Sequence, residues 1–197
     1  MLNFVQGELL VKLARRTVER SLEKGRLELE ETADKELNKP KGTFVTIHTY
    51  PAHALRGCIG FTAPMRLYEA VQRAAYAAAF NDPRFPSLRR DELDAVVFEV
   101  SVLTKPKLIS VEHPKEYGER IEAGKDGLII KRGPYSGLLL PQVWEQIPEV
   151  DKFLEALCWK AGLTKDCLSD KDVELYKFRV QAFAESKPGG KVIEVKV

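Results

Sequence analysis

The sequence contains few of the residues that mark specialised protein classes. Its 197 residues include three cysteines, three histidines, two methionines and two tryptophans. The odd set of Cys58, Cys158 and Cys167 does not fit a secreted disulfide framework or a zinc site, and is typical of free thiols in a reducing cytosol. We therefore expect a cytoplasmic protein, with Cys158 a thiol of a helical core, no metal site and no bound cofactor.

Long apolar runs and an excess of one charge are also missing. No stretch approaches the ~18 apolar residues that a membrane span needs, and the first residues lack a signal-peptide pattern. Lysine and arginine total 31 against 29 aspartate and glutamate, a net charge of +2. Because this balance gives little counterion-release drive, we expect neither nucleic acid nor a membrane as partner. High lysine and glutamate content with few asparagines is a pattern of heat-adapted proteins.

What the chain does have is a mixture of helical and strand patterns, with 44% hydrophobic residues. Apolar spacing predicts helices over 2–24, 66–80, 114–122 and 150–161. The helix over 66–80 follows Pro64. Alternating or β-branched runs predict strands over 43–49, 95–103, 128–131, 138–140, 173–184 and 192–197. Since strands outnumber long helices without regular alternation, we expect an α+β fold of mostly antiparallel sheets with packed helices. The length fits one domain over 1–197, built of two intimate subdomains.

The most unusual segment is the hexapeptide LRGCIG at 55–60. Its glycines, Gly57 and Gly60, allow a positive φ or the close approach of another backbone. Cys58 beside the guanidinium of Arg56 fits either a low-pKa nucleophile or part of an anion pocket. The alternative is that the glycines form a β-bulge and the thiol packs as a small apolar group.

A nucleophilic cysteine needs a base within hydrogen-bond reach. His48 and His53 are the histidines nearest to Cys58 in the sequence, and either is a candidate base. The alternative is that neither has a catalytic role, with His48 on a strand face and His53 exposed in a loop.

A second candidate segment is the stiff, proline-flanked loop that follows the second helix. Asp82 and Arg84 either orient a substrate or form a salt bridge at the helix end. Glu99 lies within an apolar strand, so its carboxylate needs a partner or a shifted pKa. We expect Arg56 or Arg84 to pair with Glu99 or Asp82. The hexapeptide, the loop and Glu99 would then converge on one cleft for an anionic or carbonyl-bearing ligand.

Six motifs, in this order, resemble the prokaryotic AMMECR family over essentially the whole chain. They are LRGCIG at 55–60, DPRFP at 82–86, EVSVL at 99–103, GKDGLI at 124–129, GLLLPQV at 137–143 and CWKAGL at 158–163. The resemblance implies an α+β fold of two unequal subdomains with a cleft near the hexapeptide. It also implies a modification pathway shared with a Memo-type protein and a radical S-adenosylmethionine protein.

Two functions follow as hypotheses, both using an unknown small molecule or peptide. One is a small enzyme or enzyme subunit. Its catalytic residues would be Cys58, Arg56 and His48, and its ligand-binding residues Gly57, Gly60, Asp82, Arg84, Phe85 and Glu99. The other is a non-catalytic ligand- or protein-binding module that uses the same cleft, with Cys58 in its wall. An exposed thiol with a lowered pKa would favour the enzyme, and a buried thiol would favour the module.

Overall fold

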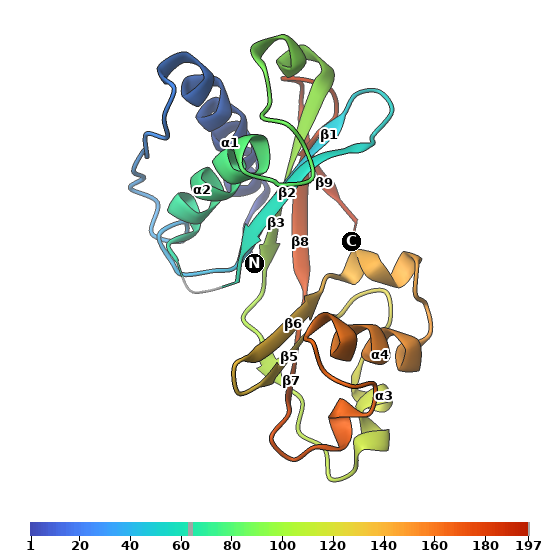
Figure 1. Cartoon of the computed structure of the whole chain (residues 1–197). Coiled ribbons are helices and arrows are strands. Elements are labelled where there is room, and N and C mark those ends of the chain that lie inside the picture. Colours follow the sequence, from blue (N-terminus) through green and yellow to red (C-terminus); the bar gives the residue numbers. More distant parts are fainter. Residues whose placement is uncertain (63–64, 197) are drawn as a thin grey trace. The chain divides into compact units, whose positions relative to one another are not determined.

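The chain folds into two compact units, each with its own sheet (Figure 1). A computed structural model describes residues 1–62 and 65–196. The first unit contains Met1–Val102 and Gln181–Lys196, and the second contains Leu103–Val180. The predicted α+β class with antiparallel sheets and unequal subdomains is confirmed. Pro64, before the second predicted helix, and Val197, at the end of the last predicted strand, lie outside the described residues.

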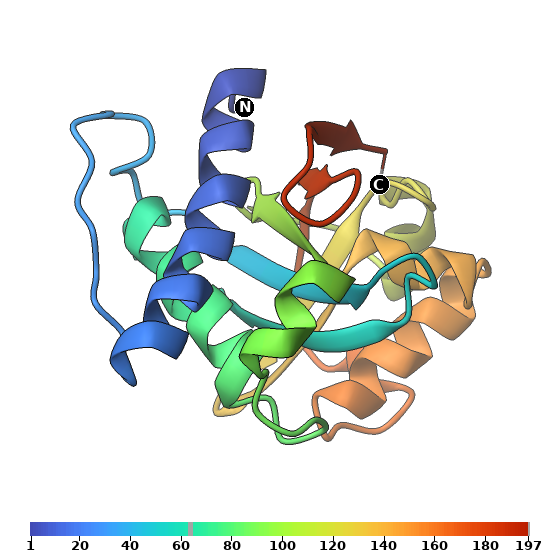
Figure 2. The same cartoon turned by 90° about the horizontal axis from the view of Figure 1, so that it is seen from above.

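The first unit is a five-stranded sheet with two long helices on one face (Figures 1 and 2). Its strands are arranged in the order β2-β1-β3-β8-β9. Strand β1 pairs antiparallel with both β2 and β3, and β9 pairs antiparallel with β8. The elements are α1 (Phe4–Lys24), β1 (Thr43–Thr49), β2 (Leu55–Phe61), α2 (Leu67–Phe80), the 3-10 helix η1 (Arg90–Ala95), β3 (Val96–Leu103), β8 (Val180–Glu185) and β9 (Val192–Val195).

Helix α1 ends at the predicted residue and begins at Phe4, two residues after the predicted start. The side chain of Asn3 accepts a hydrogen bond from the backbone N–H of Gln6 at 2.9 Å, which caps the first turn. Gly25 ends the helix with a φ of 69°, a left-handed conformation that glycine adopts without strain. Between these ends, Leu10 and Leu13 are fully buried against the sheet and α2. The predicted apolar stripe therefore forms the core of this unit.

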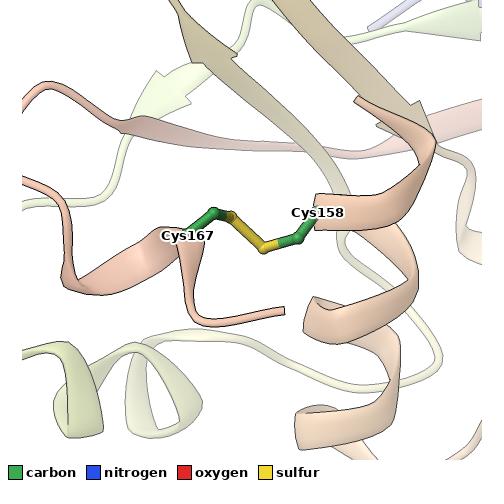
Figure 3. Close-up of a disulfide and its surroundings, with 2 residues drawn as sticks. All are labelled: Cys158 and Cys167. Atoms are coloured by element: carbon green, nitrogen blue, oxygen red, sulfur yellow. A yellow bond between two sulfur atoms is a disulfide. The ribbon is translucent and has the colours of Figure 1, made fainter. Parts of the chain in front are cut away.

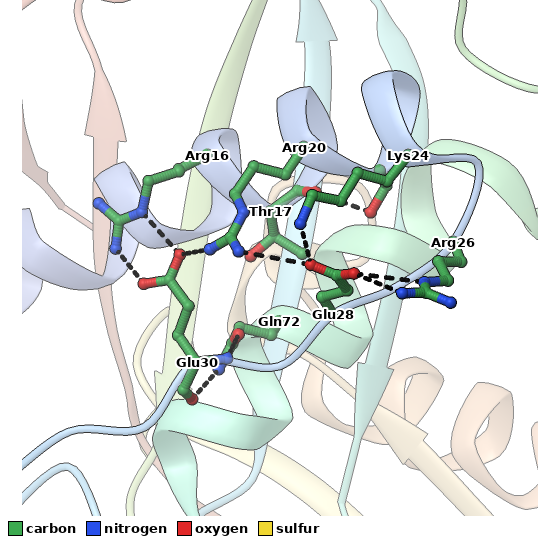
Figure 4. Close-up of polar contacts among 9 residues, drawn as sticks. Arg16, Thr17, Arg20, Lys24, Arg26, Glu28, Glu30 and Gln72 are labelled. Carbon is green, nitrogen blue, oxygen red and sulfur yellow. Dashed lines mark hydrogen bonds and ion pairs between the residues drawn. The ribbon is translucent and has the colours of Figure 1, made fainter.

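The connection after α1 is tied to both helices by polar contacts (Figure 4). Arginine and lysine side chains on α1 bind the carboxylates of Glu28 and Glu30. The Gln72 side chain on α2 accepts a hydrogen bond from the backbone N–H of Glu30 at 2.7 Å and donates to its carbonyl at 2.9 Å. This segment, predicted as a solvated connection, is thus held at fixed points. The network consists of Arg16, Arg20, Lys24, Arg26, Glu28, Glu30 and Gln72.

The second unit is a four-stranded sheet in the order β4-β7-β5-β6, and helix α4 packs on β5 and β6 (Figure 1). Its core contains Leu128, Ile130, Phe153 and Leu157. The elements are β4 (Lys107–Leu108), the 3-10 helix η2 (Pro114–Glu116), α3 (Tyr117–Arg120), β5 (Gly127–Arg132), β6 (Tyr135–Leu139), the 3-10 helix η3 (Pro141–Glu145), α4 (Val150–Lys160), the 3-10 helix η4 (Cys167–Ser169) and β7 (Glu174–Phe178).

The single strand predicted over 173–184 is wrong, because this segment forms two strands in different sheets. Strand β7 belongs to the second sheet and β8 to the first. Phe178 and Phe183, five residues apart, would point to opposite faces of one continuous strand. Dividing the segment at Arg179 allows each ring to be buried within its own unit.

The expectation of three free thiols is also wrong. Cys158 near the end of α4 and Cys167 at the start of η4 form a disulfide, and Cys58 remains free (Figure 3). The chain reverses direction after α4 at Gly162, whose φ is 74°. This reversal brings two cysteines nine residues apart in the sequence to a Cα separation of 6.1 Å.

The hexapeptide is itself a strand, β2, at the edge of the five-stranded sheet. Neither Gly57 nor Gly60 has a positive φ, so close approach is the reason for both glycines. A Cβ atom on Gly57 would lie 2.2 Å from the carbonyl oxygen of Ala78 in α2. A Cβ atom on Gly60 would lie 2.2 Å from the ring of Phe44. The first neighbour is helix backbone and the second is a side chain that can tilt away.

The two glycines therefore differ in what a methyl group would cost. We expect Gly57→Ala to lower the free energy of unfolding by ~1–3 kcal/mol, as overpacking against rigid backbone does. Gly60→Ala should cost less, because the half-buried Phe44 ring can move. Urea unfolding of both variants measures the difference. Gly118→Ala in α3 is the control, since its Cβ would meet only ordinary contact, and an equal loss in all three variants would contradict the prediction.

The disulfide closes a short loop, so its loss should favour the unfolded chain. Replacing Cys158 and Cys167 together by alanine should lower the free energy of unfolding by about 2–3 kcal/mol. Cys58→Ala is the matched control, because it removes the free thiol and leaves the bridge intact. Thiol titration of the unreduced, denatured chain should count one thiol. A count of three would show that the bridge does not form.

Candidate functional site

A β-bulge places the side chain of Arg56. In the pairing of β1 with β2, His48 lies opposite Leu55 and Ile47 lies opposite Gly57, which leaves Arg56 as the extra residue. A bulge changes the direction of the side chain that it carries. A bulge is therefore present, but its extra residue is Arg56 and not one of the glycines that the alternative named.

The buried Arg56 side chain binds Glu92 of η1 through two parallel hydrogen bonds. Its Nε donates to Oε1 at 2.8 Å and its Nη2 donates to Oε2 at 3.1 Å. Its third nitrogen, Nη1, is buried without a hydrogen-bond partner in the described part of the chain. The sequence predicted Glu99 or Asp82 as the partner of Arg56, and the structure pairs Arg56 with neither of them. The Phe85 ring lies near it, with the guanidinium carbon 6.0 Å from the ring centroid.

Asp82 and Arg84 bind the outer edge of β2 at Cys58. The backbone N–H of Cys58 donates to Oδ2 of Asp82 at 2.9 Å, and Nη2 of Arg84 donates to the Cys58 carbonyl at 3.2 Å. Arg84 and Asp82 also pair with each other, with an Nη2 to Oδ2 distance of 2.7 Å. A carboxylate and a guanidinium thus occupy the place that a neighbouring strand would take. We call this set the edge cap.

The edge cap fixes the charges of its members. The Arg84 guanidinium, and then the N–H of Cys58, hold the pKa of the buried Asp82 carboxyl well below its usual range. The same ion pair raises the pKa of Arg84. Both groups are therefore charged at neutral pH, and the predicted pairing of Arg84 with Asp82 is confirmed.

Cys58, Thr46 and Glu99 form a row across three strands. Thr46 lies opposite Cys58 in the pairing of β1 with β2, and opposite Glu99 in the pairing of β1 with β3. The hydroxyl of Thr46 donates to Sγ of Cys58 at 3.3 Å, and the hydroxyl of Ser101 donates to Oε1 of Glu99 at 3.3 Å. Successive residues of a strand point to opposite faces. The row therefore lies on the face opposite the one where Val45 and Ile47 contact the helices. We call these three residues the Cys58 row.

Burial favours the neutral forms of both acids in the Cys58 row. It raises the pKa of the Cys58 thiol, which the Thr46 hydrogen bond and the Arg84 charge oppose in part. Glu99 and Asp82 add to this rise, because their negative charges disfavour a thiolate. Burial also raises the pKa of Glu99, with a smaller opposing effect from Ser101.

His48 lies on the same face of β1 as Thr46, two residues along the strand. Its partner in β2 is Leu55, on the other side of the bulge from Cys58. Burial, and then the nearby His53, lower the pKa of His48. Across residues 1–62 and 65–196, the one side-chain hydrogen bond to Sγ of Cys58 comes from Thr46. The predicted base His48 is thus not the residue that hydrogen-bonds the thiol.

The structure brings most of the predicted site residues to Cys58. Asp82 and Arg84 contact its backbone, and Glu99 follows it in the row. Phe85 lies beside both Arg84 and Arg56. Three residues of the site, Thr46, Ser101 and Glu92, are not among those predicted from the sequence. If the hexapeptide had been recognised as a strand, a hairpin pairing with 43–49 would have indicated Thr46.

Two absences concern the described residues only. No group of three or more histidine, cysteine, aspartate or glutamate side chains in residues 1–62 and 65–196 is arranged to hold a metal ion. No helix in the same residues is both long and apolar enough to cross a membrane.

Comparison with known proteins adds the family. The family model AMMECR1 matches residues 11–183. Protein MJ0810 of Methanocaldococcus jannaschii is 46% identical over 199 residues, covering 100% of this chain and 98% of that one. Protein MK0488 of Methanopyrus kandleri is 46% identical, covering 98% and 95%. The crystal structure of an uncharacterized protein of Pyrococcus horikoshii, PH0010, matches with a TM-score of 0.87 and 45% identity, covering 97% of each chain. The chain belongs to the AMMECR1 family.

Proposed function

We propose that the chain is a binding module, and that the Cys58 row, with Arg84 and Phe85 beside it, is its binding site. The supporting observation is that burial raises the pKa of the Cys58 thiol. A cysteine nucleophile reacts as the thiolate, and reactive cysteines have a lowered pKa. Cys58 is thus better suited to line a site than to attack a substrate.

The protonation states in the row determine which ligand it suits. A thiol in its neutral form, which burial favours for Cys58, donates a hydrogen bond. The Arg84 side chain, 54% exposed, adds further donors at the edge of the sheet. The Phe85 ring offers an apolar surface next to them. This set favours a small molecule or peptide group that presents a carbonyl or a carboxylate.

An enzyme that uses the same residues is the second candidate. The observation in its favour is the raised pKa of Glu99 in the same row as a thiol, because groups with perturbed pKa values cluster at active sites. In that case Cys58 would be the nucleophile, with Glu99 or His48 as base and Arg56 nearby. A cytoplasmic location and the Memo-type and radical S-adenosylmethionine partners stay predictions from the sequence.

The pH at which Cys58 reacts separates the two candidates. Because Cys58 is the free cysteine, iodoacetamide labelling of the unreduced protein reports on this thiol alone. We expect labelling to rise at a higher pH than for a solvent-exposed cysteine in a peptide. Thr46→Val should move the profile to still higher pH, because it removes a hydrogen bond that favours the thiolate. Glu99→Gln should move it to lower pH, because it removes a negative charge.

A profile at lower pH than the peptide's would contradict the binding module and favour the enzyme. Glu119→Gln is the matched control for Glu99→Gln, since Glu119 is exposed on α3. It should leave the labelling profile unchanged.

The ligand class can be tested with small probes in an NMR titration. We expect N-methylacetamide and sodium acetate to shift the backbone amide signals of Thr46, Cys58 and Glu99 in a concentration-dependent way. Ethylammonium, which offers donors but no acceptor, should leave these signals in place. Cys58→Ala should reduce the shifts of Thr46 and Glu99, because it removes the thiol donor of the row. Shifts with ethylammonium alone would contradict the proposal.

A further inference from the structure

The second unit contains a groove that lies outside the site described above. Its volume is about 440 Å³, within the range of ligand pockets. The groove lies between the segment that follows β4 and the segment that joins η4 to β7. Leu108, Leu168 and Leu175 give it apolar walls. None of the site residues predicted from the sequence lines this groove.

The groove opens where two strands stop pairing. Lys107 and Leu108 of β4 pair antiparallel with Lys177 and Tyr176 of β7. The backbone N–H of Ile109 then donates to the Leu175 carbonyl at 2.8 Å. Beyond this bond the two segments separate, and residues of both line the groove.

Unused backbone groups remain where the pairing ends. In a strand, alternate residues direct their N–H and C=O groups to the same side. Since the Ile109 N–H donates to the Leu175 carbonyl, Val111 and Val173 would be the next residues to pair. The N–H of Val173 donates to the Asp170 carbonyl at 3.2 Å. In the described part of the chain, the Val173 carbonyl and both backbone groups of Val111 have no protein partner. An added strand would find donors and acceptors here.

The charge around the groove is acidic. Its lining includes three carboxylates, Glu112, Asp170 and Glu174, against one cation, Lys171. Asp170 is bound by Arg132 at 2.5 Å, and Glu174 accepts a hydrogen bond from the Tyr176 hydroxyl at 2.9 Å. Glu112 forms no ion pair with the described residues. A basic side chain in the groove would therefore meet an uncompensated carboxylate.

We propose that this groove binds an extended, basic peptide segment of a partner protein. The peptide backbone bonds to the free groups of Val111 and Val173, and it lies between the two segments where they separate after Ile109. Alternate side chains of the peptide contact the apolar walls of the groove, and a lysine or arginine of the peptide lies against Glu112. Recognition by strand addition draws affinity from the backbone and specificity from such alternate contacts.

The disulfide helps to hold one wall of the groove. Helix η4 begins at Cys167, and the next residues, Leu168 and Ser169, line the groove. The bond to Cys158 attaches this wall to α4. A wall fixed before binding loses less conformational entropy when a peptide arrives.

The proposal is tested by selecting a phage-displayed library of random twelve-residue peptides on the full-length wild-type protein. Enriched peptides should contain lysine or arginine and bind in fluorescence anisotropy. In NMR spectra, their footprint should fall on residues 108–112 and 168–175. Methylation of alternate backbone nitrogens in a selected peptide should abolish binding, because it removes the donors that pair with the strand edge.

Variants of the protein provide the controls. Glu112→Lys should weaken a selected peptide about tenfold or more. The matched Glu119→Lys, an exposed charge reversal in the same unit that does not line the groove, should leave binding unchanged. Selection of no binding peptide, enrichment of acidic peptides, a footprint on another surface, or full binding after N-methylation would each overturn the proposal.

Discussion

The hydrogen bond from the Cys58 backbone to the Asp82 carboxylate is the contact on which the hexapeptide region depends. An edge strand leaves N–H and C=O groups without partners, and exposed edges invite pairing with other chains. Here the edge cap takes that place, with Asp82 as acceptor and Arg84 as donor. Burying the carboxylate is costly, and this cost is offset by charged and backbone donors. The same loop carries Phe85, whose ring lies beside Arg56 and Arg84.

Much of the hexapeptide is thereby explained by packing. Gly57 permits the close approach of α2, Gly60 accommodates the Phe44 ring, and Arg56 joins a bulge in β2 to η1 through Glu92. Such a motif can be specific to a family without marking a reaction centre, because a fold also imposes strict requirements. The thiol of Cys58 and the carboxyl of Glu99 are the groups that these packing roles do not explain.

The sequence predicted the elements in which one periodicity dominates. Helices α1, α2 and α4 follow apolar stripes and end at Gly25, Asn81 and Gly162 or next to them. The hexapeptide was not predicted as a strand, because two glycines in six residues weaken strand propensity. For the site, the cost of burying charge correctly predicted the pairing of Asp82 with Arg84. It wrongly predicted an arginine partner for Glu99, which reaches the Cys58 row through the pairing of β1 with β3. It could not indicate Glu92 or the disulfide, whose positions depend on where η1 and η4 fold in three dimensions.

The first unit is built from two pieces of chain separated by the whole of the second unit. Strand β3 has β8 as its neighbour, and β8 begins only after residues 103–179 have been made. During synthesis from the N-terminus, the second unit, which is continuous in sequence, is therefore complete before the first sheet can receive its last two strands. Until then β3 remains an open edge in the nascent chain. Synthesis and folding of β8 and β9 are thus the steps that complete the sheet in which the hexapeptide lies.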